Sequence, residues 1–108
     1  MKRSQRAMQI WQILISAAHN RQILTYKIVG KFTGMGSGTQ SQTLDMIMRY
    51  CKRNHLPPLT SLVVKKTTGR PGTGLTTVGN LDRDRERVFA ENWFGLPPVT
   101  IADLEIKD

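Results

Sequence analysis

The chain has little of several residue types, and each shortage excludes a class of protein. With one cysteine, Cys51, among 108 residues, it cannot form an intramolecular disulfide, and we expect a reducing compartment, the cytoplasm. Aromatic residues make up only 6%, so a core must be built mainly from aliphatic side chains. The longest apolar stretch, residues 10–18, is interrupted by Gln12 and Ser16 and is shorter than the ~20 residues of a membrane span. We therefore expect neither a membrane segment nor a signal peptide.

Acidic residues are nearly absent from the first three quarters of the chain. Residues 1–81 hold twelve Lys and Arg against a single acid, Asp45, whereas residues 82–108 hold four against seven acids. We expect one structural domain with a basic body, residues 1–81, and an acidic C-terminal helical extension, residues 82–108, packed on it. A basic body predicts a polyanionic partner, nucleic acid above all, although charge that serves only solubility would give the same total.

Catalytic and metal-binding patterns are also missing. Two histidines, His19 and His55, and Cys51 are too scattered for a zinc site, whose ligands come in closely spaced pairs. The glycines at 34, 36 and 38 lack the GK[ST] that completes a phosphate-binding loop. The acids lie mostly in the tail, between arginines. We therefore expect no enzymatic activity, no cofactor and no metal.

The spacing of apolar residues predicts three helices in the basic body. Residues 4–20 carry an apolar stripe at three- and four-residue steps, with Ser4 as the cap and Trp11 as a core anchor. Thr25 caps a second helix at residues 26–32, and a third follows at residues 39–54. Because the glycines between the last two allow a tight turn, the pair is typical of a helix-turn-helix.

The segment after the third helix predicts a β-hairpin. Two prolines end the helix, and residues 59–67 and 75–78 are rich in apolar and β-branched residues around a glycine turn. The expected hairpin tip carries three cations: Lys65, Lys66 and Arg70. Further helices are expected at residues 83–92, capped by Asp82, and at residues 101–106, capped by Thr100. The predicted fold class is α+β, a small winged helix-turn-helix with three N-terminal helices, a β-hairpin wing and a C-terminal helical extension.

The third helix and the hairpin together predict an interface with duplex DNA. A helix in the major groove reads base edges near its N-terminus and meets phosphates further along, while a basic hairpin touches the backbone or the minor groove. Asp45 fits poorly, since phosphates repel a carboxylate, and a merely solvated helix face would look similar. The predicted nucleic-acid-binding residues are Tyr26, Lys27, Gln40, Ser41, Gln42, Thr43, Arg49, Arg53, Lys65, Lys66 and Arg70.

The order of features in residues 24–72 resembles a known family. A Thr-Tyr helix start at residues 25–26, a glycine turn, a helix ending at Asn54, a proline-led segment and a Val-Val strand occur in sequence. Together they are similar to the winged-helix DNA-binding domain of alkylguanine-DNA alkyltransferases and alkyltransferase-like proteins. The resemblance implies that Tyr26 helps to push a nucleotide out of the duplex.

Two positions depart from that family. Ser41-Gln42-Thr43 stands where the family carries an arginine that fills the gap left by the nucleotide. Leu59-Thr60-Ser61 follows Pro58 where the family has its nucleophilic cysteine in a Pro-Cys-His-Arg motif. Cys51, on the apolar face of a helix, is expected to be a packed residue and no substitute. The resemblance therefore implies DNA binding without alkyl transfer.

The segment LPPLTSLVV…TGRPGTG also resembles small uncharacterised winged-helix modules of bacterial and phage genomes, some fused to HNH nuclease domains. We predict a non-catalytic DNA-binding protein, regulatory or related to mobile elements or defence, that contacts duplex DNA through residues 39–54 and 65–70. The alternative is a phage- or plasmid-encoded interaction protein that binds and modulates a host nucleic-acid-handling enzyme. A homodimer through residues 1–20 or 99–108, or a protein partner at the C-terminal extension, fits either reading. The apolar contact proposed for a partner is Met35, Met46, Met48, Phe89 and Trp93.

Overall fold

A computed structural model describes residues 1–72 and 80–106 of the chain. Within those residues the structure is mostly helical, with five α-helices, two short 3-10 helices and one pair of short strands. The order along the chain is α1 (Arg3–His19), β1 (Leu24–Thr25), α2 (Tyr26–Thr33), α3 (Ser37–Arg53), η1 (Leu59–Leu62), β2 (Val63–Val64), α4 (Leu81–Ala90), η2 (Trp93–Gly95) and α5 (Ile101–Glu105).

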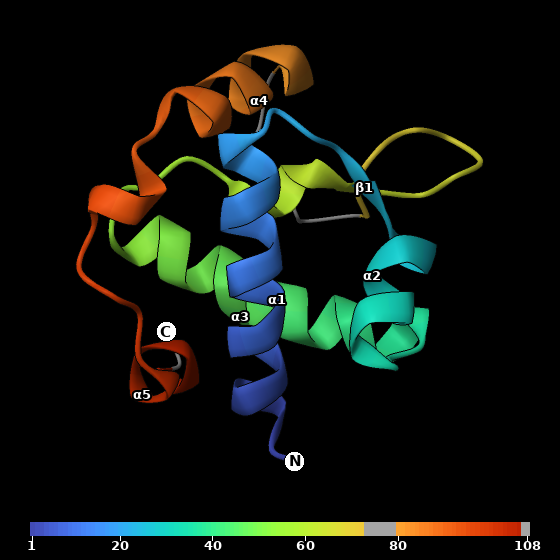
Figure 1. The fold of residues 1–108 in the computed structure, drawn as a ribbon, viewed down its shortest axis with the longest axis vertical. Coiled ribbons are helices and arrows are strands. Elements are labelled where there is room, and N and C mark those ends of the chain that lie inside the picture. Colours follow the sequence, from blue (N-terminus) through green and yellow to red (C-terminus); the bar gives the residue numbers. More distant parts are fainter. Residues whose placement is uncertain (73–79, 107–108) are drawn as a thin grey trace.

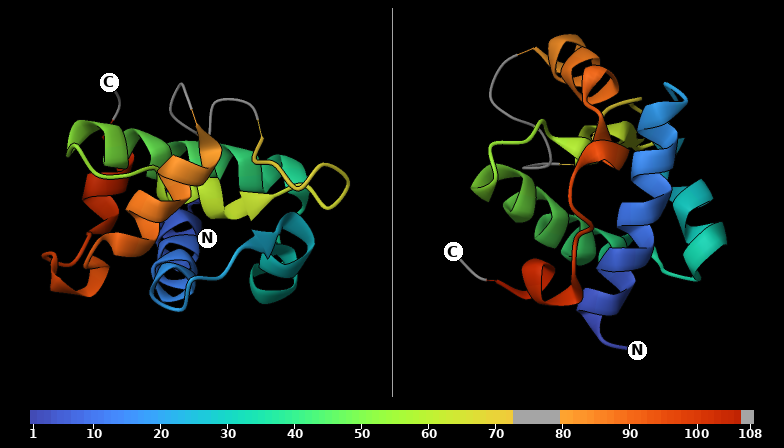
Figure 2. Two further views of the ribbon diagram at one scale, coloured as in Figure 1. Left: turned by 90° about the horizontal axis from the view of Figure 1, so that it is seen from above. Right: turned by 60° about the vertical axis from the view of Figure 1, so that its left-hand side comes forward.

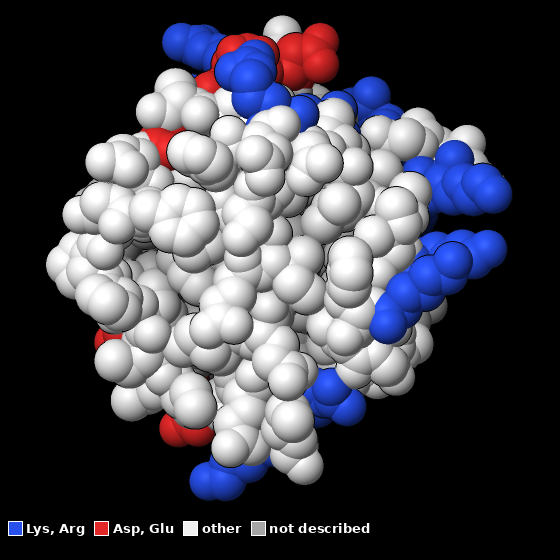
Figure 3. Space-filling model, viewed as in Figure 1, with Lys and Arg blue, Asp and Glu red and all other residues white. Residues whose placement is uncertain are grey.

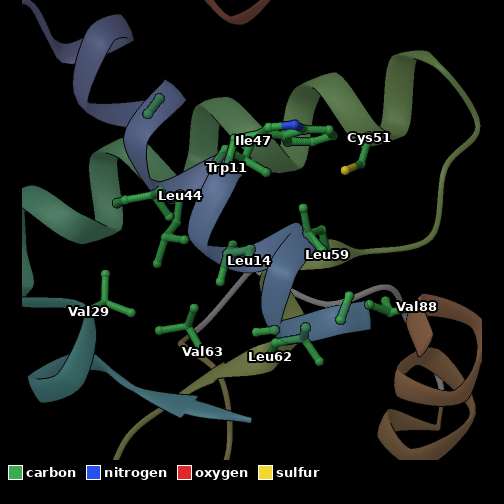
Figure 4. Close-up of a cluster of buried hydrophobic side chains, with 14 of the residues drawn as sticks. Trp11, Leu14, Val29, Leu44, Ile47, Cys51, Leu59, Leu62, Val63 and Val88 are labelled. Carbon is green, nitrogen blue, oxygen red and sulfur yellow. The ribbon is translucent and has the colours of Figure 1, made fainter. Parts of the chain in front are cut away.

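Helix α1 is the centre of the arrangement, with α3 crossing behind it and the other elements around the two (Figures 1 and 2). The core between them is mainly aliphatic, as the composition predicted, and Figure 4 shows part of it. Trp11 is 5% exposed and meets the rings of Tyr50 and Trp93 edge-on, at centroid distances of 5.3 and 5.7 Å. Its predicted role as a core anchor is confirmed. The acidic part of the chain contributes Val88, Trp93 and Leu104 to the same core.

The three predicted N-terminal helices are present, and local chemistry explains the second of them. The Thr25 hydroxyl accepts the Ile28 N–H at 3.2 Å, which caps the first turn of α2 as predicted. The helix ends at Gly34, whose φ of 75° lies in the left-handed region that glycine reaches without steric cost. A Cβ on Gly30 would lie 2.9 Å from the Met35 carbonyl oxygen and 3.1 Å from Gln40 Nε2. Glycine at position 30 therefore lets α2 pack closely against the start of α3.

Of the other three predicted caps, two are wrong and one is confirmed. Ser4 lies inside α1, where its hydroxyl donates to Glu105 Oε1 at 2.7 Å and ties α1 to α5. Asn80, rather than Asp82, caps α4 by accepting the Arg83 N–H at 3.2 Å. At α5 the reciprocal Thr100–Asp103 capping box is present as predicted.

The predicted winged-helix fold is wrong, because the described residues form no β-hairpin wing. Strand β2 pairs in parallel with β1, so that Leu24 lies opposite Val63 and Thr25 opposite Val64. Residues 59–62, expected to be strand, form the 3-10 helix η1, and all four are buried between α1, α3 and α4. Burial on several sides, and not β propensity, thus determines the conformation of this segment. The predicted return strand, residues 75–78, lies outside the described residues.

None of the helices in the described part of the chain combines the length and the apolar character needed to cross a membrane.

Candidate nucleic-acid interface

Three segments of the chain meet at the side chain of Tyr26, the first residue of α2. Its hydroxyl is hydrogen-bonded to the Ser41 side chain, in the first turns of α3, and to the backbone of Gly72. Burial raises the pKa of Tyr26, and these two hydrogen bonds offset part of the rise. We call this contact the Tyr26 junction. It fixes the start of α2, the start of α3 and Gly72 against one another.

The segment of residues 65–70 is a closed turn, which we call the 65–70 loop. The Gly69 N–H donates to the Lys65 carbonyl at 2.8 Å, and the Lys65 N–H donates to the Arg70 carbonyl at 2.9 Å. Gly69 has a φ of 67°, a conformation that favours glycine. Arg85 of α4 reaches the base of the loop and donates to the carbonyls of Ser61 and Gly69 at 3.4 and 3.3 Å. Helix α4 thus supports, through Arg85, the loop that carries the predicted cations.

Exposed cations gather along the side of the molecule that α2 and the 65–70 loop form. Figure 3 shows Lys and Arg side chains projecting there, where Figure 1 places α2 and the loop. We call this set the cationic edge; its members are Lys27, Lys31, Lys65, Lys66 and Arg70, all exposed. Arg70 has an acidic neighbour, since it lines a cavity of about 400 Å³ together with Asp82 and Arg85. The other four carry the larger share of the positive field.

Two of the predicted DNA-binding residues are buried, which corrects their assignment. Gln40 is 1% exposed, and its Nε2 donates to the carbonyls of Tyr26 and Met35 at 2.8 and 3.1 Å. Thr43 is fully buried, and its hydroxyl donates to the Gln40 carbonyl at 2.8 Å. Both lie on the helix face that also buries Leu44 and Ile47, so they hold the helix pair together. By contrast, Ser41 and Gln42 are exposed.

The two arginines of α3 are engaged within the protein. Arg49 Nε lies 3.0 Å from Asp45 Oδ2, one helical turn back. The Asp45 carboxylate, which fitted the DNA prediction poorly, thus has a partner within the helix. Arg53 donates to the backbone carbonyls of Asp103 at 2.7 Å and Ile106 at 3.4 Å. Arg53 therefore ties the end of α3 to α5 and is engaged away from DNA, whereas Arg49, 44% exposed, is held only by a surface ion pair of a kind that contributes little.

The sequence reasoning missed Lys31 and misplaced the apolar contact. Lys31 follows Lys27 by four residues in a helix, a spacing that places both on one face and was available as a signal. Of the residues proposed as an apolar contact, Met35, Met48 and Trp93 are buried, and Met46 and Phe89 are partly buried. Apart from Met1 at the chain start, the large apolar side chains most exposed among the described residues are Phe32 and Phe94, at 70% and 61%.

Cys51 is a packed side chain, as predicted. It is 1% exposed, and burial raises the pKa of its thiol to about 11. A thiol in this environment is a poor nucleophile, since the thiolate is the reactive form. Among the described residues, no group of three or more His, Cys, Asp or Glu side chains could hold a metal ion.

Comparisons of the chain with protein-family models, with curated proteins and with solved structures gave no match. The resemblance of residues 24–72 to alkyltransferases therefore stays a prediction from the residues alone. The Tyr26 junction and the cationic edge are the features on which a function has to be argued.

Proposed function

We propose that the protein is a non-catalytic DNA-binding protein that holds duplex DNA along the cationic edge. The observation that carries the proposal is the Tyr26 junction, which brings cations from two segments about forty residues apart in the sequence to one side of the molecule. A cluster of exposed cations on one face is the electrostatic footprint of a nucleic-acid-binding protein. The single cysteine favours the cytoplasm as the place of action.

The members of the edge divide into two kinds of contact. Lys27 and Lys31 stand one turn apart on α2, about 6 Å along the helix axis, and the 65–70 loop adds three more cations. Flexible lysines meet phosphates as point charges and carry little sequence information. Gln42, exposed in the first turns of α3, is the side chain suited to reading a base, because glutamine pairs with adenine in the major groove. We expect affinity to come from the edge and any sequence preference from Gln42.

Salt dependence gives the first test. Five phosphate contacts predict that log K falls against log salt concentration with a slope of about −4.5, since each contact contributes about 0.9. The measurement is fluorescence anisotropy of a labelled duplex across a salt series. An affinity that does not change with salt would remove the proposal.

A charge reversal with a matched control locates the contact. Lys27→Glu and Lys52→Glu both reverse an exposed lysine on a helix, but Lys52 stands at the C-terminal end of α3, away from α2 and the 65–70 loop (Figure 1). We expect Lys27→Glu to weaken binding and to make the salt slope shallower by about one, while Lys52→Glu keeps the wild-type slope. Equal losses from the two variants would show that net charge alone drives binding.

A further inference from the structure

Two grooves flank helix α1 on its outward side. The first, which we call the α2 groove, lies between α1 and α2 and has a volume of about 650 Å³. Its apolar lining includes Ile13, Leu24, Ile28 and Phe32. The second, the Trp groove, lies between α1 and residues 93–99 and has a volume of about 200 Å³. Gln12, an exposed residue of α1, lines both, so the grooves lie on either side of it.

Each groove carries an exposed phenylalanine. Phe32 lines the α2 groove and is 70% exposed, while Phe94 lines the Trp groove and is 61% exposed. The Phe94 ring meets the His19 ring edge-on at a centroid distance of 5.8 Å, which holds it outward beside the groove. Large aromatic side chains beside a concave apolar surface are the usual anchors of protein–protein contacts. These two project from opposite sides of α1.

The surface that holds both grooves is uncharged, although the chain has a net charge of +8. The described residues that line the two grooves include no Lys, Arg, Asp or Glu. Figure 3 looks onto this surface and shows it free of charged side chains across α1 and toward residues 93–99, with the charges around its margin. We call it the uncharged face. Two copies of a strongly basic chain repel each other, and contact through this face brings no charged groove-lining residue of one copy against the other.

We propose that a second copy of the chain docks on the uncharged face, with the two-fold axis parallel to α1. Rotation about such an axis exchanges the two sides of α1, so the α2 groove of one copy meets the Trp groove of the other. Phe32 then faces the partner's Trp groove while Phe94 faces the partner's α2 groove, which makes the contact self-complementary, as a two-fold interface requires.

A two-fold contact of ordinary size covers a modest part of the surface of each chain. The chain has a total accessible surface of 6411 Å², and a stable interface takes about 800 Å² from each partner, roughly one eighth of that total. The cationic edge lies at the margin of the face and stays open. This inference goes beyond DNA binding and does not depend on it.

Sedimentation velocity of the DNA-free protein, from about 1 to about 300 μM, tests the proposal. We expect a concentration-dependent dimer whose dissociation constant falls as salt rises, because salt screens the repulsion between basic copies. Phe32→Lys and Phe94→Lys should each raise the dissociation constant by roughly tenfold or more, since each change enters the interface twice. Circular dichroism should show unchanged folding, because both side chains are exposed.

Ile106→Lys is the matched control, since Ile106 is 50% exposed but lies between α3 and α5, outside both grooves. It should dimerise like the wild type. A protein that stays monomeric at every concentration overturns the proposal, and so does a dimer that both phenylalanine variants leave intact.

Discussion

Replacement of Gly30 by alanine tests the packing on which the candidate interface rests. Alanine in a helix interior is favoured over glycine by about 1 kcal/mol, so propensity alone predicts a stabilised protein. The new Cβ, however, would lie 2.9 Å from the Met35 carbonyl oxygen, a backbone atom in the turn that leads into α3. Relief of that contact has to move the turn, and overpacking of this kind costs about 1–3 kcal/mol.

The same contact endangers the hydrogen bonds of Gln40. In the wild type, Gln40 Nε2 donates to the carbonyls of Tyr26 and Met35. In the variant, the new Cβ would lie 3.1 Å from this nitrogen. A weakened hydrogen bond at this buried site adds about 0.5–1.5 kcal/mol to the loss. The costs exceed the gain in propensity, so we expect Gly30→Ala to lower the free energy of unfolding by about 0.5–3.5 kcal/mol.

Urea denaturation, followed by circular dichroism, measures the effect, and Gly38→Ala is the matched control. Gly38 also lies in a helix, but a Cβ there would meet nothing within 4 Å. This variant should therefore be as stable as the wild type or more stable by up to about 1 kcal/mol. If Gly30→Ala gains stability as Gly38→Ala does, the close packing of α2 on α3 inferred from these distances is refuted.

Two further predictions concern single side chains, the partly buried Tyr26 and the buried Cys51. Tyr26→Phe removes the hydroxyl that bonds Ser41 and the Gly72 backbone, so we expect the free energy of unfolding to fall by about 1 kcal/mol and duplex affinity to fall with it; unchanged affinity in the anisotropy assay would separate the junction from binding. Burial raises the pKa of the Cys51 thiol from 9.0 to about 11, so the folded state keeps a proton that the unfolded chain loses first. The stability from this group is complete below pH 9 and declines toward pH 11, by about 2–3 kcal/mol in all. The difference in unfolding free energy between wild type and Cys51→Ala should shrink over that range, and a constant difference would contradict the shift.

Helix positions could be predicted from the sequence because periodic burial sets them. The stripe around Trp11 and the cap at Thr25 depend on contacts within a few residues of each element, which a sequence displays directly. The η1 segment could not be predicted in the same way. Its residues 59–62 are apolar or hydroxyl-bearing, as in a strand, and only the packing of three helices around them forces a 3-10 turn.

The candidate site shows the same division between local and distant causes. The exposure of Lys65, Lys66 and Arg70 followed from a polar turn, and the structure places them at the surface. Gln40 was misassigned because its polar side chain was taken as a sign of exposure, although its position four residues before Leu44 places it on the buried face. Arg53 donates hydrogen bonds to carbonyls about fifty residues away in the sequence, and no local sequence pattern predicts such contacts.

The two proposals, taken together, restrict how DNA can be held. Rotation about an axis parallel to α1 moves the cationic edge from one side of the uncharged face to the other, so the edges of the two copies point apart (Figures 1 and 3). Dimers that straddle one palindromic site present both binding elements to the same side of a duplex, one helical turn apart. The geometry inferred here cannot do that. Each copy would instead hold its own duplex, and the dimer would link two duplexes through a contact that carries no charge.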